Sequence, residues 1–564
     1  MGEDRLSGRD AGIALLIAAA SFLFLFPVVW HGFVSFDDPL YVTQNPHVRG
    51  GFTPENIGWA FGSFHAGYWI PVTWLSYMAD GALWGGRAFG YHLTNLILHA
   101  ACALLLFLAL LRLTGDRWRS ALVAGLFALH PLHVETVAWV SERKGLLSAF
   151  FSFAALYFYA GYARKPGILR YLAVFLSAAL SMLSKPLAVV LPLLLLVLDY
   201  WPLARFEGRP AKAALAGLAL EKAPLFILSA VISAVTVMAH SEFGAIHASV
   251  PLWARCANAV LSLALYLKKT VWPVDLAVFY PHPGTGISIP AVLLALVFLA
   301  AVTVLAVRLA DRRPYLLAGW LWYLLALLPA LGFVQAGAQA MADRFTYVSL
   351  TGIFFAAAFA LPGGRRLVPV AAACAAVLAA SALLSVRQAG YWKSSLTLFT
   401  HAAEVTKNNA YAENRVGLAL SDAGDKAGAL PHFKKAAAGD PGYLAARNNL
   451  AGSYMANGEF DRAADELKAA IAAHPEGVSA EIYNNLGAAV AQAGDFSEAA
   501  EWFYKAVRLS PKDPKIRYNL GNALFLASRL TEAERELRAV LALDPSHALA
   551  RERLNQILEG KARK

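Results

Sequence analysis

Two adjacent carboxylates, Asp37 and Asp38, stand in the stretch Phe-Asp-Asp-Pro-Leu-Tyr directly after a long apolar run. A charge beside lipid is costly, so such residues are either solvated in a loop or held in place for chemistry. A carboxylate that is partly desolvated and close to a second one can take the proton of a hydroxyl group. The pair therefore predicts a general base. An Asp-Asp-Pro turn that ends a helix is the structural alternative.

A second polar stretch holds His130, His133, Glu135, Arg143 and Lys144 at one expected membrane depth. It is improbable that so many polar residues face lipid, and we therefore expect them to line a cavity. The first three could bind a metal, although the spacing of an HExxH zinc motif is absent. The two cations suit a phosphate group, and snorkelling to the membrane surface is their structural alternative.

A third group lies at the start of a later apolar run, where Asp343, Arg344 and Tyr347 occur close together. The guanidinium of Arg344 can bind a phosphate in a bidentate manner with Asp343 orienting it, although a structural salt bridge would use the same residues. Lys185 is a further cation next to an apolar run. Trp69 belongs to an aromatic-rich loop that could stack on a sugar or form part of an interfacial belt.

The elements that would position these residues are membrane helices, because 58% of the 564 residues are hydrophobic and only 15% are charged. Eleven spans are predicted, at residues 11–30, 91–113, 120–140, 145–162, 171–183, 187–201, 223–238, 290–307, 315–331, 345–361 and 367–386. The first is longer than a signal-peptide core and lacks a clear cleavage site, so we expect it to be retained. Residues 261–272 are interpreted as an interfacial helix because Lys268 and Lys269 interrupt them.

Basic residues occur in every second loop, which places the N-terminus inside and accounts for much of the net charge of +11. Nucleic acid is therefore not an expected partner. An odd number of spans places the three polar groups and the polar C-terminal part on the outer side. We expect a membrane domain over residues 1–386 and an extracytoplasmic domain over residues 387–564.

The C-terminal part repeats about every 34 residues, with small residues, alanines and prolines recurring in register. This pattern is typical of tetratricopeptide repeats, predicted at residues 410–443, 444–477, 480–513 and 514–547 with an end helix at 548–560. Side-chain amides would face the concave groove and bind an acceptor peptide, or else cap and solvate helices. These amides are Asn448, Asn449, Asn484, Asn485 and Asn519.

Taken in order, the Asp-Asp loop, the His-Pro-x-His-x-Glu turn, Lys185, the Asp-Arg-Phe stretch and the repeats resemble the transmembrane and tetratricopeptide-repeat O-mannosyltransferases. These belong to the wider GT-C glycosyltransferases. The resemblance covers essentially the whole chain. It implies an all-α fold, with a polytopic bundle followed by an α-solenoid.

The resemblance also implies an inverting transfer of a sugar, such as mannose, from a polyprenyl-phosphate donor to a Ser or Thr hydroxyl of a protein. One carboxylate of the Asp37–Asp38 pair would be the base. Arg344, Arg143, Lys144 and Lys185 would bind the donor phosphate, and a pocket would be formed by His130, His133, Glu135, Trp69, Asp343 and Tyr347. No cofactor or metal is expected. The expected location is a bacterial inner membrane, with the repeats on the periplasmic side.

Two other functions stay open at this stage. A lipid-linked sugar transporter would be expected to show broken helices at corresponding places of two repeated halves, and the sequence shows no such symmetry. A non-catalytic assembly scaffold would need only the repeats, with the carboxylates serving as turn formers.

Overall fold

The computed structural model describes residues 7–208, 210–242, 250–333, 337–362, 367–475 and 477–562. The chain forms two compact units, Met1–Thr406 and Lys407–Lys564. The expected division at residues 386 and 387 falls inside helix α17 (Leu367–Tyr391), and α18 (Ser395–Val405) still belongs to the first unit.

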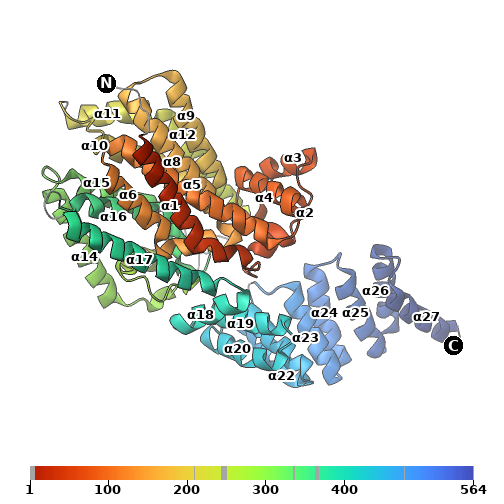
Figure 1. The fold of residues 1–564 in the computed structure, drawn as a ribbon. Helices are drawn as coiled ribbons and strands as arrows, with labels where there is room; N and C mark the ends of the chain where they lie inside the picture. Colours follow the sequence, from red (N-terminus) through yellow and green to blue (C-terminus); the bar gives the residue numbers. More distant parts are fainter. Residues whose placement is uncertain are drawn as a thin grey trace. The chain divides into compact units, whose positions relative to one another are not determined.

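The first unit is a bundle in which α1, α6 and α8 all pack against α5 (Figure 1). Its longer helices are α1 (Gly8–Leu25), α3 (Pro54–Gly62), α4 (Pro71–Trp84), α5 (Ala88–Thr114), α6 (Arg117–Leu129), α8 (Arg143–Arg164), α9 (Ile168–Ser184), α10 (Leu191–Tyr200), α11 (Ala211–Glu221), α12 (Ala223–Glu242), α13 (Leu252–Val271), α14 (Ile289–Arg308), α15 (Pro314–Leu327) and α16 (Thr346–Ala360). Its shorter helical segments include η1 (Phe26–Trp30), η2 (Pro39–Thr43), α2 (Pro46–Arg49), η3 (His65–Gly67), η4 (Pro131–His133), α7 (Val134–Ala138), η5 (Val140–Glu142), η6 (Pro186–Val190), η8 (Leu328–Ala330) and η9 (Asp343–Phe345).

Each predicted span is helical, but they differ in length. Six segments are long and apolar enough to cross a membrane alone: Gly8–Trp30, Ala88–Thr114, Val140–Arg164, Ala223–Glu242, Ile289–Arg308 and Val368–Tyr391. A bent pair, Arg117–Leu129 and Pro131–Ala138, makes a seventh candidate with a 55° bend. Among the described residues, six or seven of the eleven predicted spans are therefore long and apolar enough to cross alone, and the other predicted spans correspond to shorter helices.

Proline explains two of these interruptions. Pro131 follows α6 and Pro186 follows α9, and each begins a short 3₁₀ turn because proline cannot continue a helix that precedes it. Both breaks occur beside polar residues singled out in the sequence. The predicted interfacial segment 261–272 lies mostly in α13, which is not among the helices apolar enough to cross.

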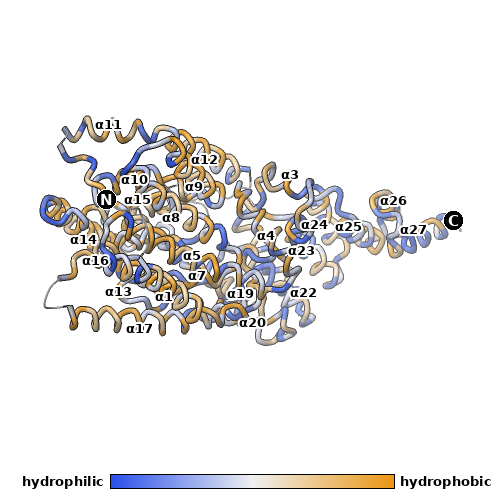
Figure 2. Tube along the Cα trace, turned by 45° about the horizontal axis from the view of Figure 1, so that its top comes forward, coloured by the Kyte–Doolittle hydropathy of each residue, from blue (hydrophilic) through white to orange (hydrophobic). Residues whose placement is uncertain are grey.

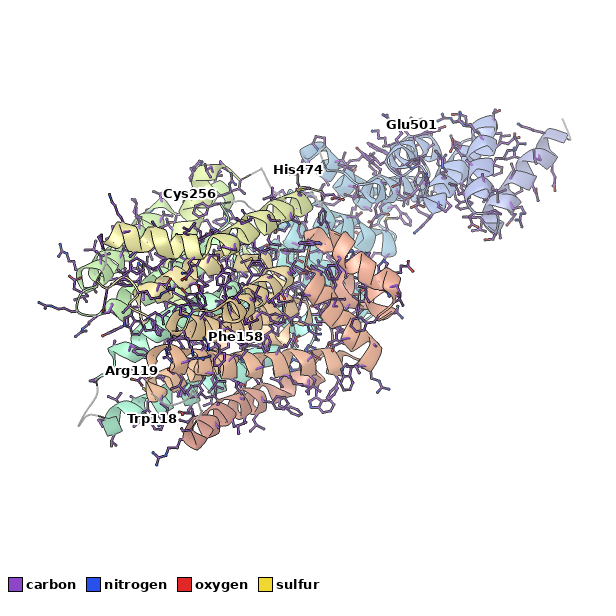
Figure 3. All side chains as sticks on the ribbon, turned by 90° about the horizontal axis from the view of Figure 1, so that it is seen from above. Trp118, Arg119, Phe158, Cys256, His474 and Glu501 are labelled. Carbon is purple, nitrogen blue, oxygen red and sulfur yellow. The ribbon has the colours of Figure 1, made fainter. Side chains whose placement is uncertain are left out.

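The outer surface of the bundle is apolar, as lipid contact requires. Leu294 on α14 and Val368 on α17 are 73% and 81% exposed, and hydrophobic residues run along α17 (Figure 2). Trp118 projects from the start of α6 (Figure 3) and is 72% exposed. Such a large exposed apolar area fits an integral membrane protein.

Functional side chains are placed by segments that connect or end these helices. The segment after η1 carries Asp37, η5 leads into α8 with Lys144, and Lys185 separates α9 from η6. A two-stranded antiparallel sheet joins β1 (Tyr280–Pro281) to β2 (Gln339–Met341), pairing Tyr280 with Met341. This pairing fixes the segment that leads into η9 and Arg344.

The second unit consists of paired helices followed by one more: α19 (Ala410–Asp422) with α20 (Lys426–Gly439), α21 (Leu444–Ala456) with α22 (Phe460–Ala473), α23 (Ala480–Ala493) with α24 (Phe496–Leu509), α25 (Pro514–Leu526) with α26 (Leu530–Leu543), and α27 (Ala548–Ala562). Small residues allow each pair to approach closely. A Cβ atom added at Gly417 would lie 2.5 Å from the ring of Phe433, and one at Gly487 would lie 2.9 Å from Phe503. The predicted all-α fold, a membrane bundle followed by a tetratricopeptide-repeat solenoid, is confirmed.

Candidate functional site

A cavity of about 380 Å³ lies within the first unit and brings together four of the predicted site residues, Asp37, Lys144, Lys185 and Arg344. They come from four segments that are far apart in the sequence. The other lining residues are Tyr68, Trp139, Glu142, Pro186, Leu187, Val189, Ser233, Thr236, Val237, His240, Pro329, Ala330, Gly332, Gln339, Ala340 and Phe345. One carboxylate and three cations of the sequence prediction thus share one cavity.

Asp37 and Asp38 point in different directions although they are adjacent. Asp37 is half-buried and lines the cavity. Its carbonyl oxygen accepts a hydrogen bond from the backbone N–H of Tyr41 at 2.9 Å, and the short π-helical segment η2 begins at Pro39. The backbone of this turn therefore sets the position from which the Asp37 side chain enters the cavity.

Asp38 is a buried structural acceptor and is absent from the cavity lining. It is 1% exposed and accepts hydrogen bonds from the N–H of Val34 at 2.9 Å, and from the N–H and hydroxyl of Ser141 at 3.0 and 2.5 Å. Burial raises the pKa of Asp38 to about 6, and these hydrogen bonds oppose the rise. Asp38 therefore ties the segment after α1 to the segment that precedes α8.

Arg143 and Lys144 also diverge. Arg143 is fully buried, forms an ion pair with Asp80, and donates to the side chain of Asn95 at 2.8 Å and the carbonyl of Tyr91 at 2.7 Å. The predicted contact of Arg143 with a donor phosphate is replaced by this internal network, because successive helix positions point about 100° apart. Lys144, the next residue, faces the cavity.

The ammonium of Lys144 lies among aromatic rings. Its Nζ is 4.4 Å from the ring centre of Tyr41, 5.5 Å from that of Tyr68 and 5.7 Å from that of Trp139. It donates to the hydroxyl of Tyr41 at 3.3 Å. Cation–π contacts hold the charge in place without neutralising it. Lys144 is therefore oriented and can still attract an anion.

Arg344 is held in place by Glu135, which lies outside the cavity lining. Glu135 accepts from the backbone N–H of Arg344 at 2.9 Å and from its guanidinium at 2.6 Å. Glu135 is buried but does not line the cavity, so its role is to orient Arg344. The ring of Trp139 lies 5.3 Å from the guanidinium carbon.

Asp343, which precedes Arg344, holds the same segment in place through a contact with Tyr280. Both carboxylate oxygens of Asp343 accept from the hydroxyl of Tyr280 at 3.0 Å. Burial raises the pKa of Asp343 to about 8. The residue lies outside the cavity lining and connects the β1 segment to η9.

Lys185 and Glu142 form a buried ion pair at the edge of the cavity. The other oxygen of Glu142, Oε2, lies 3.9 Å from Nζ of Lys144 and 4.0 Å from Nε of Arg344. Glu142 therefore lies between all three cations. The sequence contained it within the second polar stretch, but no spacing rule distinguished it from its neighbours.

Aromatic residues form one wall of the cavity. The ring of Trp139 stacks on that of Phe36 at 4.9 Å with an interplanar angle of 9°. Tyr68 lines the cavity, whereas the predicted Trp69 donates its indole N–H to the carbonyl of Phe61 at 2.8 Å and points elsewhere. Tyr68 and Trp139 line the cavity but were not among the predicted pocket residues. The abundance of aromatic residues in the first loop was the only sequence signal for Tyr68, and nothing in the sequence indicated Trp139.

His130, His133 and Tyr347 pack inside the bundle instead of lining the main cavity. His130 donates to the carbonyl of Thr270 at 2.9 Å, and His133 to that of Phe127 at 2.7 Å. The hydroxyl of Tyr347 lies 2.7 Å from Nδ1 of His99. Tyr347 lines a smaller cavity of about 50 Å³ that shares Lys185 and Arg344 with the main one.

A metal alternative for the second polar stretch finds no support in this geometry. The described residues contain no group of three or more His, Cys, Asp or Glu side chains placed to hold a metal ion. His130 and His133 are committed to carbonyl groups, and Glu135 binds Arg344.

In the second unit the predicted amides bind one another across successive repeats. Asn449 donates to Asn414 at 2.8 Å, Asn485 to Asn448 at 2.9 Å, and Asn519 to Asn484 at 2.8 Å. Each bond joins an amide of one repeat to the amide one register position earlier in the preceding repeat. The amides thus form a ladder that links the first helices of the four pairs.

The fold and the site together define an integral membrane protein with a polar cavity in its helical bundle and a second unit of helical pairs like those of tetratricopeptide repeats. Family models described as tetratricopeptide repeat match residues 415–477, 448–514 and 490–557. Residues 415–557 are therefore tetratricopeptide repeats. A crystal structure of YrrB, a TPR protein, is 24% identical over 29% of this chain and 84% of its own, with a TM-score of 0.27.

Over most of its length the chain is similar to curated proteins named protein O-mannosyl-transferase. TMTC3 of Mus musculus is 24% identical over 514 residues, which is 84% of this chain and 53% of that protein. TMTC4 of Mus musculus is 24% identical over 489 residues, 75% of this chain and 66% of that protein. The predicted resemblance is confirmed, and the chain spans about half the length of the first of these relatives.

Proposed function

We propose that this protein transfers a sugar, such as mannose, from a polyprenyl-phosphate donor to a Ser or Thr hydroxyl of a protein acceptor. The observation that carries the proposal is the cavity in which Asp37 meets Lys144, Lys185 and Arg344. A carboxylate and a set of cations in one cavity are what deprotonation of a hydroxyl and departure of a phosphate require. The names of the relatives support the class of reaction and the choice of sugar.

Asp37 is the proposed general base, because it is the predicted carboxylate that lines the cavity. It takes the proton of the acceptor hydroxyl while the hydroxyl oxygen forms a bond to the anomeric carbon. The bond between that carbon and the phosphate oxygen breaks in the same step, and the electron pair leaves with the phosphate. A single displacement inverts the configuration of the anomeric carbon.

Lys144, Lys185 and Arg344 are proposed to stabilise the phosphate as it leaves. Charge builds up on the leaving oxygen in the transition state, and preorganised cations in a partly buried site act most strongly there. Removal of one such group typically lowers turnover by about 10²–10³-fold. We propose that these cations make a divalent metal unnecessary, which predicts full activity in EDTA.

The remaining lining fits the other parts of such a donor. Tyr68 and Trp139 offer ring faces for a sugar, and Leu187, Val189 and Val237 offer an apolar path for a prenyl chain. Two of these apolar residues belong to η6 and one to the exposed helix α12. A lipid-linked substrate would thus keep its chain in an apolar environment while its phosphate reaches the cations.

The repeats are proposed to bind the acceptor protein. An amide has two donors and an acceptor, and pairing within the ladder uses only one donor of Asn449 and Asn519. The first helices therefore retain polar groups for a peptide backbone. We propose a bacterial inner membrane as the location, with both the cavity and the repeats on the periplasmic side, as the basic loops predict.

The proposal is tested with purified full-length protein, a radiolabelled polyprenyl-phosphate sugar and a Ser/Thr-containing peptide. We expect transfer by the wild type and a loss of at least about 100-fold in Asp37→Asn. Asp311→Asn is the matched control, because Asp311 is an exposed carboxylate of the same unit that does not line the cavity. Full activity of Asp37→Asn, or flux of the donor across proteoliposomes without transfer, would overturn the proposal.

A further inference from the structure

The position of Glu142 raises a question that the transfer reaction alone does not answer. Its side chain is fully buried, lines the cavity and pairs with Lys185 through one oxygen. The other oxygen makes no hydrogen bond, yet it lies 3.9 Å from the ammonium of Lys144 and 4.0 Å from Nε of Arg344. An anionic group thus lies close to all three cations that are suited to bind an anion.

The formal charges show what this position does to the site. The lining includes three cations, Lys144, Lys185 and Arg344, and two carboxylates, Asp37 and Glu142, so its net formal charge is +1 with His240 uncharged. Without Glu142 the same lining would carry +2. Glu142 therefore reduces the net positive charge of the site by one unit, so that an anion with a single negative charge is enough to balance it.

We infer that Glu142 makes the cavity select a phosphodiester, which carries one negative charge, over a phosphomonoester, which carries two. The inference rests on the proposed function, in which the donor is a phosphodiester and the product is a phosphomonoester. A monoester has its second ionisation near pH 6, so it is largely dianionic above neutral pH. Its extra charge is repelled by Glu142, and the product is released to make room for the next donor.

The size of the effect follows from the separation of the charges. Two of the three cations that would bind a phosphate, Lys144 and Arg344, lie within 4.0 Å of Glu142 Oε2, so a bound phosphate sits a few ångströms from the same carboxylate. One additional unit charge at such a distance in a partly buried site changes a binding constant by on the order of tenfold or more. Glutamine at this position keeps the shape and removes the repulsion.

The test compares two short probes, hexyl phosphate and hexyl methyl phosphate, which differ by one methyl ester and therefore by one ionisable proton. Their binding to the purified full-length protein is followed by ³¹P NMR titration at pH 8. In the wild type we expect the diester to bind at least as tightly as the monoester. In Glu142→Gln we expect the monoester to gain about tenfold in affinity relative to the diester.

Two control variants separate charge from structure. Glu142→Asp keeps the charge and is expected to keep the wild-type ratio of the two affinities. Asp199→Asn removes an equally buried carboxylate, paired with Lys222 at 2.6 Å and absent from the cavity lining, and is also expected to keep the ratio.

The outcomes distinguish this inference from the proposed function. If the wild type binds both probes but prefers the monoester by tenfold or more, or if Glu142→Gln leaves the ratio unchanged, the inference is overturned and the donor site stands. If the wild type binds neither probe, the phosphate site of the proposed function is overturned as well. Should Glu142→Gln fail to fold, the wild-type ratio decides alone.

Discussion

Arg143 and Lys144 are adjacent in the sequence, but the structure gives them opposite roles, and substitution should separate these. Arg143→Met leaves Asp80 buried at 3% exposure without its ionic partner. The hydrogen bond that this carboxylate accepts from the hydroxyl of Thr94, at 2.8 Å, does not neutralise it. Breaking one side of a buried ion pair costs about 3–5 kcal/mol.

The assay is thermal unfolding of the purified protein in detergent, followed by intrinsic tryptophan fluorescence. A given loss of stability changes Tm less in a large domain than in a small one. We therefore expect Arg143→Met to lower the apparent Tm of the membrane unit by at least about 4 °C. The double variant Arg143→Met with Asp80→Asn removes both charges and should recover most of this loss.

Lys144→Gln is the comparison. Lys144 lies 3.9 Å from Glu142 and has a single weak hydrogen bond, to Tyr41, so its removal should leave the Tm within about 2 °C. Turnover should fall by about 100-fold because a phosphate-stabilising charge is gone. The reasoning is refuted if Arg143→Met keeps the wild-type Tm and loses turnover, or if the double variant is no more stable than the single one.

Three further results are expected. Burial raises the pKa of Asp38 to about 6 from an ordinary 3.8, so the stability contribution of this group is present below about pH 4 and is lost as the pH rises through about 6. The wild type should therefore lose about 3 kcal/mol relative to Asp38→Asn between pH 4 and pH 7.5, and parallel Tm profiles of the two proteins would contradict this. Asn519→Ala removes the bond to the buried amide of Asn484 and should destabilise the repeat unit by about 1–2 kcal/mol in limited proteolysis, whereas the exposed Gln492→Ala should not. Lys185→Met should lower turnover by about 100-fold and also lower the Tm, since it leaves Glu142 buried without its closest partner.

The order of helices and repeats was predictable because each depends on local pattern. An apolar run long enough to be helical needs no information from the rest of the chain. The register of glycine, alanine and proline likewise fixed the paired helices of the second unit, including the close approach of Gly417 to Phe433. One local break was less visible, since Pro131 interrupts a segment that hydropathy predicted as one span over residues 120–140.

Side-chain direction was the part that could not be predicted. In three places the residue that reaches the cavity is next to the one that does not: Asp37 beside Asp38, Lys144 beside Arg143, and Tyr68 beside Trp69. A rotation of one residue changes the direction by about 100° in a helix and by more in a turn. Tertiary packing, which no local pattern contains, decides which neighbour faces inward.

The same limit applies to residues that support the site. Glu135 stood out as part of a metal-like stretch, and its function in the structure is to hold the guanidinium of Arg344. Glu142 had no distinguishing spacing, yet it lies between all three cations of the cavity. Residue type indicated the chemistry available, and only the folded arrangement showed how it is distributed.

The central claim is that one cavity binds the donor phosphate between the three cations with the reacting carbon towards Asp37. The most direct measurement is a cryo-electron microscopy structure of the protein with a non-hydrolysable polyprenyl phosphonate sugar. The account predicts phosphonate oxygens within about 4 Å of Lys185 and Arg344, and the anomeric carbon on the side of Asp37. A phosphonate bound elsewhere, with the cavity unchanged and Asp37 remote from the sugar, would contradict it.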